Sequence, residues 1–145
     1  MQFMEVDRNG LEVLDRHECL RLLALATLGR IGFTSGALPT VLPIDFHLDG
    51  ERILVRTGRG STLDAALQNA VVAFEVDDFD PIHHSGWSVT VTGEATEVSD
   101  PAERAAAHRG PVARWAPAGD EAVIAISTEL VYGRRIPAGS LATQR

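Results

Sequence analysis

The sequence predicts a mainly β fold, an antiparallel barrel of about six strands with about three short helices attached to it. Six or so segments have the composition of β-strands, and most of them are separated by turns short enough to form hairpins. The helical segments lie at connections and do not alternate regularly with the strands, so we do not expect a doubly wound parallel sheet. At 145 residues, 45% of them hydrophobic, the chain is large enough for one domain with its own core.

The first predicted element is a helix over residues 15–26. Asp15 is a suitable N-cap, and Glu18 follows three residues later in a capping-box-like arrangement. Cys19 lies on the apolar face of this helix, so we expect a buried and unreactive thiol. Residues 1–13 are interpreted as an N-terminal arm.

Two strands are predicted next, over residues 29–34 and 40–47. Pro43 interrupts the second one. Because proline cannot donate to a ladder, it indicates an edge strand, a bulge or a place where a ligand takes the neighbour's role, and we favour the edge strand. Asp49 and Gly50 then form a strong hairpin turn into the following strand.

Residues 52–67 are the stretch most suggestive of function. A short β-rich run turns through two glycines into a helix whose N-cap is Ser61. Such a turn brings free N–H groups and the positive end of a helix dipole to one place, which favours an anion. An ordinary βα connection with solvated arginines gives the same pattern, and both interpretations stay open here. The donors that crowd this place are Arg56, Thr57, Arg59, Ser61 and Thr62.

Two more strands are predicted over residues 70–76 and 87–98, with a loop between them that contains His83 and His84. Adjacent histidines suggest a metal, but no third ligand stands at a useful spacing, so no metal site is predicted. Gly93, inside the second of these strands, indicates a bulge or a tight bend of the kind found at barrel corners.

The last predicted elements are a helix that begins at Asp100 and a strand over residues 122–126, which continues after a break. The chain shows no internal repeat and no domain linker. We therefore place one barrel domain at residues 14–136, followed by a C-terminal tail of residues 137–145.

Charge and composition narrow the function. The net charge of −7 argues against a nucleic-acid-binding surface. All 13 basic residues are arginine, so a Schiff-base lysine is excluded, and with it covalent pyridoxal phosphate chemistry. No apolar run is long enough to cross a membrane, and we expect a soluble, cytoplasmic protein.

Several short pieces of the sequence occur in an order and spacing that are fairly specific to one family. They are Pro43-Ile44-Asp45-Phe46, Asp49-Gly50, Val55-Arg56-Thr57, Gly60-Ser61-Thr62-Leu63, Gly86-Trp87-Ser88-Val89 and Gly133-Arg134-Arg135. In this order they resemble the flavin-mononucleotide-binding (FMN-binding) split barrels similar to pyridoxamine 5′-phosphate oxidase. The last two pieces fit the branch that includes nitroimidazole-reductase-like proteins. The similarity covers about residues 15–136.

The resemblance implies a six-stranded antiparallel split β-barrel that forms a homodimer, with FMN bound at the subunit interface. The cofactor site that it implies consists of Pro43, Ile44 and Asp45 along the flavin ring, Arg56, Thr57, Ser61 and Thr62 at the phosphate, Trp87 and Ser88 beside the cofactor, and Arg134 or Arg135 from the partner subunit. An ordinary core position for Trp87 and a solvated position for the two arginines remain alternatives. Many relatives place a lysine where this chain has Thr62, so the phosphate clamp would depend on Arg56.

The leading functional hypothesis is a flavin-dependent oxidoreductase that acts on an unidentified small molecule. The flavin would carry out the transfer and no side-chain acid or base is obligatory, so no catalytic residue is named. A second hypothesis keeps the fold and replaces FMN by the deazaflavin coenzyme, although this acidic chain offers few cations for its acidic tail. A third is a non-catalytic dimer that binds flavin or haem, or binds nothing.

Overall fold

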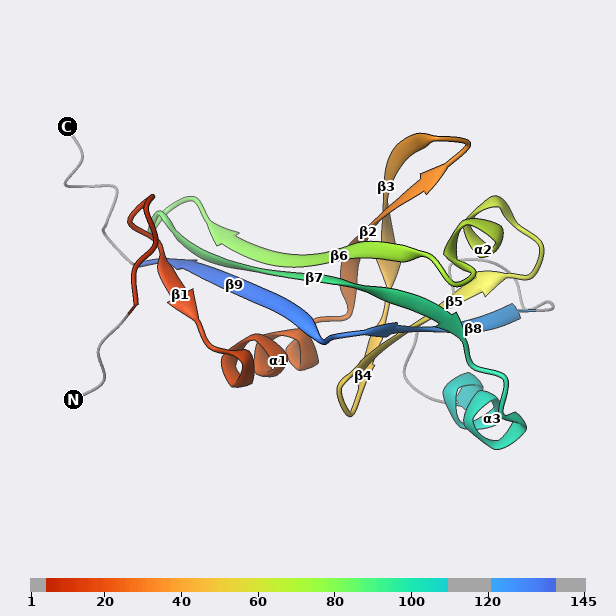
Figure 1. Cartoon of the computed structure of the whole chain (residues 1–145). Helices are drawn as coiled ribbons and strands as arrows, with labels where there is room; N and C mark the ends of the chain where they lie inside the picture. Colours follow the sequence, from red (N-terminus) through yellow and green to blue (C-terminus); the bar gives the residue numbers. More distant parts are fainter. Residues whose placement is uncertain (1–4, 110–120, 138–145) are drawn as a thin grey trace.

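The described chain, residues 5–109 and 121–137 of the computed structural model, is built on one curled antiparallel sheet (Figure 1). Its strands are β1 (Glu12–Leu14), β2 (Leu28–Ser35), β3 (Leu38–Asp45), β4 (His47–Asp49), β5 (Arg52–Gly58), β6 (Val71–Asp80), β7 (Ser85–Glu97), β8 (Glu121–Ser127) and β9 (Leu130–Ile136). The helices of the described residues are α1 (Arg16–Leu25), α2 (Thr62–Leu67) and α3 (Pro101–Arg109). The predicted mainly β fold with about three short helices is confirmed.

The sheet does not close on itself. Hydrogen-bonded neighbours follow the order β3-β2-β6-β7-β8-β5-β4, and β9 pairs with both β7 and β1. The two ends of this path, β3 and β4, do not pair with each other, which is the arrangement of a split barrel. Nine strands stand in the described residues where six were expected. Two of them, β1 and β4, have only three residues, and β8 and β9 are separate strands where one broken strand was expected.

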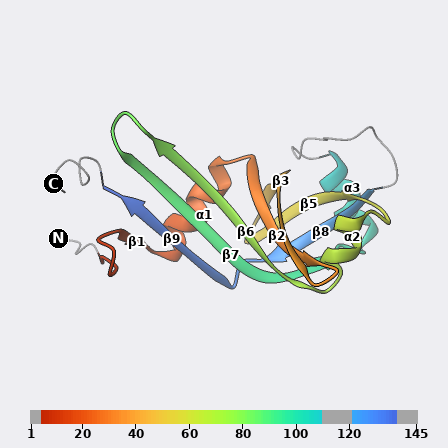
Figure 2. The ribbon, with the colours of Figure 1, turned by 90° about the horizontal axis from the view of Figure 1, so that it is seen from above.

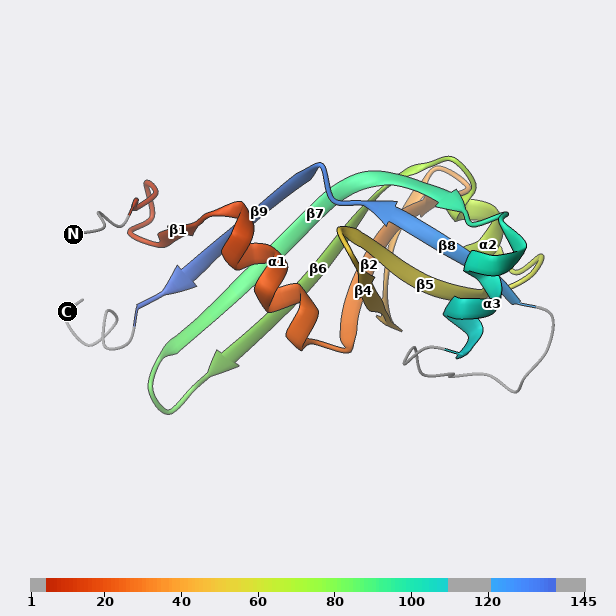
Figure 3. The ribbon, with the colours of Figure 1, turned by 90° about the horizontal axis from the view of Figure 1, so that it is seen from below.

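The long strand β7 joins the two parts of the sheet. Its residues 86–92 pair with β9, whereas its residues 95–97 pair with β8. Gly93 stands at this change of partner, where a Cβ atom would collide with the backbone carbonyl oxygen of Ser127. The missing side chain lets the two backbones approach, and the strand bends in this region (Figure 3). The ladder with β6 runs on without an extra residue, so the expected bend is present and the alternative bulge is not.

The core fills the barrel and continues beneath α1. Phe74 is fully buried, stacks edge-on against Phe46 with ring centroids 4.8 Å apart, and occupies the space that a side chain at Gly29 would need. Cys19 is also fully buried, which confirms the expected position of its thiol. Burial, followed by the nearby carboxylates of Asp15 and Glu18, raises the pKa of this thiol, so little reactive thiolate forms.

Two segments differ from the expectation. The strand expected to end at residue 76 continues as β6 to Asp80, because its ladder with β7 outweighs the low β propensity of consecutive aspartates. Glu12 and Val13, expected in an arm, form part of β1 and pair with β9. The expected tail of residues 137–145 lies outside the described residues after position 137.

Candidate functional site

One broad face of the sheet is open. Helix α1 crosses one face of β6, β7 and β9 (Figure 3), whereas no described element covers the opposite side (Figure 2), which we call the open face. Side chains of residues paired across strands stand next to each other on one face of a sheet. One row across the open face consists of Pro43 on β3, Arg30 on β2, Glu75 on β6, Thr90 on β7 and Tyr132 on β9. A neighbouring row consists of Asp77 on β6, Ser88 on β7 and Arg134 on β9.

Strand β3 forms an exposed, apolar border of the open face. It stands at the end of the strand order and, among the described strands, pairs only with β2, so the predicted edge strand is confirmed. Val41 is 66% exposed and its neighbour Pro43 is exposed as well, whereas Ile44 points into the core and is 9% exposed. Of the three residues expected along a flavin ring, Pro43 and Asp45 therefore present side chains away from the core and Ile44 presents only its backbone.

An ionic cluster occupies the centre of the open face. The Arg30 guanidinium lies 3.2 Å from the carboxylate of Glu75 and 2.8 Å from that of Asp77. Partial burial, reinforced by the neighbouring Asp77, raises the pKa of Glu75 from its ordinary 4.5 to about 7. The Glu75 carboxyl can consequently hold or release a proton near neutral pH.

Ser88 and Arg134 lie on the open face, at the end away from β3. Arg134 Nε donates to the carboxylate of Asp7 over 3.0 Å, and Nη1 donates to the carbonyl oxygen of Gly133 over 2.8 Å. The guanidinium also lies 5.6 Å from the centre of the Tyr132 ring, within the range of a cation–π contact. The structure thus brings Ser88 and Arg134 together on one side of the sheet with Pro43 and Asp45.

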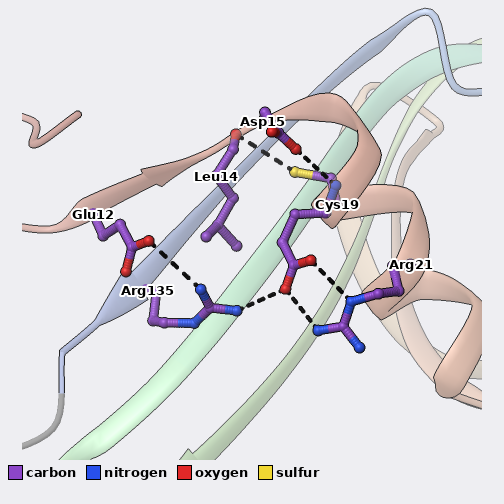
Figure 4. A network of polar contacts seen from close by, with 7 residues as sticks. Glu12, Leu14, Asp15, Cys19, Arg21 and Arg135 are labelled. Carbon is purple, nitrogen blue, oxygen red and sulfur yellow. Dashed lines mark hydrogen bonds and ion pairs between the residues drawn. The ribbon is translucent and has the colours of Figure 1, made fainter. Parts of the chain in front are cut away.

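Trp87 and Arg135 lie on the other face, beneath α1. Trp87 packs against the hydrophobic core. The Arg135 guanidinium lies 2.9 Å from Glu18 and 3.6 Å from Glu12, and Figure 4 shows its contact with Glu12. Of the two terminal arginines in the implied site, only Arg134 is on the open face.

In the glycine turn before α2, a carboxylate of the chain itself accepts the hydrogen bonds of nearby donors. The buried carboxylate of Asp64 accepts hydrogen bonds from the Thr57 hydroxyl (3.0 Å) and the Gly60 amide (2.8 Å), and Ser61 caps the helix at the Asp64 amide. Burial alone would raise the pKa of Asp64, but hydrogen bonds from Gly60, Thr57 and Gln68 outweigh burial and hold this pKa below its usual value. Ser61 and Thr62 border a shallow depression of about 450 Å³, opposite Thr34, Ser35 and Gly36 at the β2–β3 turn.

Arg56 is not brought together with Ser61 and Thr62. Its side chain points out of the barrel, but α3 covers it and only 7% of it is exposed. Nη2 donates to the carbonyl oxygen of Ala107 over 2.6 Å, and Nη1 lies 3.8 Å from the Glu121 carboxylate. Thr57, the next residue, points to the opposite face of β5, toward α2.

Four polar residues of this region were not predicted as site residues: Arg30, Glu75, Asp77 and Asp64. Alternation along the strands could have placed the first two on an outward face. Their contact depends on the register between β2 and β6, which are about forty residues apart, and no local pattern encodes that register. For Asp64 the local signal was its place in the first turn of α2, three residues after the cap Ser61.

Comparison with known proteins identifies the family. Residues 15–135 match the family described as pyridoxamine 5′-phosphate oxidase. The chain belongs to this family. The chain is also similar to the uncharacterized protein Rv0080 of Mycobacterium tuberculosis. The two are 42% identical over 132 residues, which are 88% of this chain and 86% of that protein.

Solved structures support the assignment to the pyridoxamine 5′-phosphate oxidase family. The FAD binding protein from Mycobacterium smegmatis is 34% identical with a TM-score of 0.73, over 86% of this chain and 96% of that one. A FAD-binding protein from Mesorhizobium loti has a TM-score of 0.72 at 20% identity, over 88% of this chain and 99% of that one, which shows a shared fold. No helix in the described parts of this family member is long and apolar enough to span a bilayer.

Proposed function

We propose that this protein is a flavin-dependent oxidoreductase that binds FMN at the interface of a homodimer and acts on a small molecule. The observation that supports the proposal most is the composition of the open face. It has an exposed apolar edge strand at one border and polar side chains held in fixed positions across its width. Membership of the family, and relatives whose names state that they bind FAD, support the flavin in particular.

Strand β3 fits the ring of a flavin. Within the part of the chain that the structure describes, β3 pairs only with β2, so backbone groups along its other edge are left for the donors and acceptors on the rim of a ligand ring. Pro43 has no N–H group, so it leaves one place on this edge where a ring can approach without facing a donor. The exposed side chain of Val41 adds apolar contact beside it.

The phosphate is assigned first to Ser61 and Thr62. Their hydroxyl groups border the depression beside the β2–β3 turn and carry no charge. Thr57 is a weaker part of the proposal because its hydroxyl already donates to Asp64. Arg56 is weaker still because its guanidinium is directed to Ala107 and Glu121.

The bound flavin would supply hydride or electron transfer. The protein would bind and orient the flavin ring, exclude water from it, and hold a proton. Glu75 is suited to the last task because its pKa of about 7 lets it change protonation state near neutral pH.

A second copy of the chain would complete the site. Leu38, Val41, Leu130 and Tyr132 are between 53% and 69% exposed, which is unusual for large apolar side chains of strands. A flat ligand on an open sheet needs a cover, since small-molecule sites normally enclose most of the ligand surface. A homodimer paired through this region would bury the apolar residues and cover the flavin.

FAD is the second candidate for the cofactor. A monophosphate concentrates its charge on one group, whereas the two phosphates of FAD each carry less. The uncharged Thr62 and the nearby Asp64 carboxylate suit the weaker charge better. The relative that is 34% identical is named as a FAD binding protein, which agrees with this alternative.

The absorption spectrum of the purified protein, followed by titration with FMN, FAD and riboflavin, tests the proposal. A flavin spectrum and tighter binding of FMN than of FAD would support the first candidate, and the opposite order would support the second. Uptake of deazaflavin alone, a Soret band, or no uptake of any cofactor would refute both.

A further inference from the structure

The first described residues form a small hairpin that the family match does not include. Residues 5–14 precede the match, which begins at residue 15. The hairpin is closed by a bridge between Val6 and Glu12 and by a hydrogen bond from the Val13 amide to the carbonyl oxygen of Glu5 (2.7 Å). Through β1 it pairs with β9 opposite Gly133 and the two arginines. The hairpin is therefore attached to the strand that carries Arg134.

Asp7 is fixed at both ends of its carboxylate. Oδ1 accepts hydrogen bonds from the amides of Asn9 (2.8 Å) and Leu11 (3.0 Å), which hold it in the hairpin turn. Oδ2 accepts the hydrogen bond from Arg134 Nε (3.0 Å). The Leu11 amide, followed by the Asn9 amide and Arg134, outweighs partial burial and lowers the pKa of Asp7, so the carboxylate stays charged at neutral pH.

Arg134 is held on three sides and has one nitrogen left. Asp7 engages Nε, the carbonyl oxygen of Gly133 engages Nη1, and the Tyr132 ring lies against the guanidinium. Among the described residues, no hydrogen bond or ion pair involves Nη2. A guanidinium nitrogen carries two N–H groups, and an arginine that is already ordered loses little further freedom when it binds an oxygen atom.

We propose that the N-terminal hairpin is part of the ligand site and that Asp7 is a positioning residue. It holds Arg134 so that, across the interface of the proposed homodimer, Nη2 can donate to a carbonyl or phosphate oxygen of the flavin that lies along β3 of the other subunit. The inference rests on the proposed function, because it needs the flavin on the open face. Asp7 accepts its hydrogen bond from Nε of Arg134 and does not contact Nη2. It therefore orients the guanidinium without occupying the position of the ligand.

Arg135 offers a matched control. It is the next residue on the same strand, its side chain is about as exposed as that of Arg134 (33% against 31%), and it also pairs with carboxylates. It lies on the opposite face, where Glu12 and Glu18 engage both of its terminal nitrogens. Loss of Arg135 would therefore disturb the fold without removing a group from the proposed site.

The test measures flavin dissociation constants for the full chain and four variants. Arg134→Gln should weaken binding by about 10- to 100-fold, because a hydrogen bond from a charged donor is lost. Asp7→Asn should weaken it by about 3- to 10-fold, because Nη2 remains but is less well oriented. Arg135→Gln should leave the dissociation constant within about 2-fold of the wild type. The double variant of Asp7 and Arg134 should bind no worse than Arg134→Gln alone, since Asp7 acts only through Arg134.

The ligand oxygen is located by comparing FMN with riboflavin. Equal losses for both place the oxygen on the ring, and a loss for FMN alone places it on the phosphate; both results support the proposal. A double variant that is weaker than either single variant would overturn the positioning role. Unchanged affinity in Asp7→Asn with normal flavin uptake would overturn this inference alone, whereas a wild type that takes up no flavin would overturn the proposed function with it.

A second readout needs no flavin. In the wild type, the Nε–H group of Arg134 should give a nitrogen–proton NMR signal protected from exchange, because Asp7 holds it. This signal should disappear in Asp7→Asn, while that of Arg21, whose Nε donates to Glu18 over 2.8 Å, stays. Retention of the Arg134 signal in the variant would show that Asp7 does not position the guanidinium.

Discussion

Replacing Glu75 by glutamine should make the flavin-free protein more stable at alkaline pH. Glutamine has the shape of a protonated glutamate and cannot ionise. The folded chain binds the Glu75 proton more tightly than the unfolded chain, because its pKa is raised from 4.5 to about 7. Between these two values the wild type therefore loses stability as the pH rises, and above about 7 the whole penalty is present. The variant has no such penalty.

The size of the effect follows from the raised pKa and the exposure of the cluster. A rise from 4.5 to about 7 corresponds to about 3 kcal/mol if it is converted directly. The side chain of Glu75 is 33% exposed and that of Arg30 is 56% exposed, so solvent screens the interaction and we expect about 1–2 kcal/mol. Near pH 5, where wild-type Glu75 is largely protonated in the folded state, the gain should be less than about 0.5 kcal/mol.

Urea unfolding at pH 5 and pH 8 measures this difference. Glu94→Gln, which removes an exposed carboxyl from β7, is the control and should show little dependence on pH. The same stability change at both pH values for Glu75→Gln would contradict the raised pKa. A variant less stable than the wild type at pH 8 would show that the ionised carboxylate is favourable beside Arg30, which is the opposite of the reasoning.

Three further predictions concern the scaffold and the assembly. Arg56→Ala should lower the free energy of unfolding by about 2 kcal/mol in urea titrations, because it removes the hydrogen bond from this buried side chain to Ala107 and the contact with Glu121. Arg52→Ala removes a more exposed arginine and should cost less than about 0.5 kcal/mol. Gly93→Ala should lower the free energy of unfolding by about 3 kcal/mol or prevent folding, because the added methyl group meets the Ser127 carbonyl. A melting temperature equal to that of the wild type would show that the backbones of Gly93 and Ser127 can move apart. Sedimentation equilibrium should give a dimer at micromolar concentration with FMN present, and Val41→Asp, on the exposed border, should shift it toward monomer without changing the melting temperature of the monomer.

Features encoded by neighbouring residues could be predicted from the sequence. Asp15 and Ser61 cap their helices through the amides three residues later, because an N-cap is a local hydrogen bond. Pro43 indicated its edge strand for a similar reason, since the missing N–H group is a property of the residue itself. The order of the pieces was sufficient for the family and for the split barrel.

Features that depend on distant packing could not be predicted. The outward direction of Arg56 follows from alternation, but its cover by α3 involves a residue 51 positions away. The same limit separated Arg134 from Arg135: the sequence shows two adjacent arginines, and only the pairing of β9 with β7 and β1 decides which of them faces away from α1. The cap pattern places Asp64 in the first turn of α2. It does not show that the Asp64 carboxylate accepts hydrogen bonds from Thr57 and Gly60, since these depend on how the preceding turn folds back.

The division of β7 between two partners has a consequence for cooperativity. One continuous strand takes part in the ladder with β9 and in the ladder with β8, so neither part of the sheet can open without disturbing the backbone of the other. Units that open independently in hydrogen exchange usually have their own boundaries, and here the boundary would fall in the middle of a strand. Amide protons on both sides of Gly93 should therefore exchange through one shared opening event, and a ligand that orders the open face would protect the barrel strands as well.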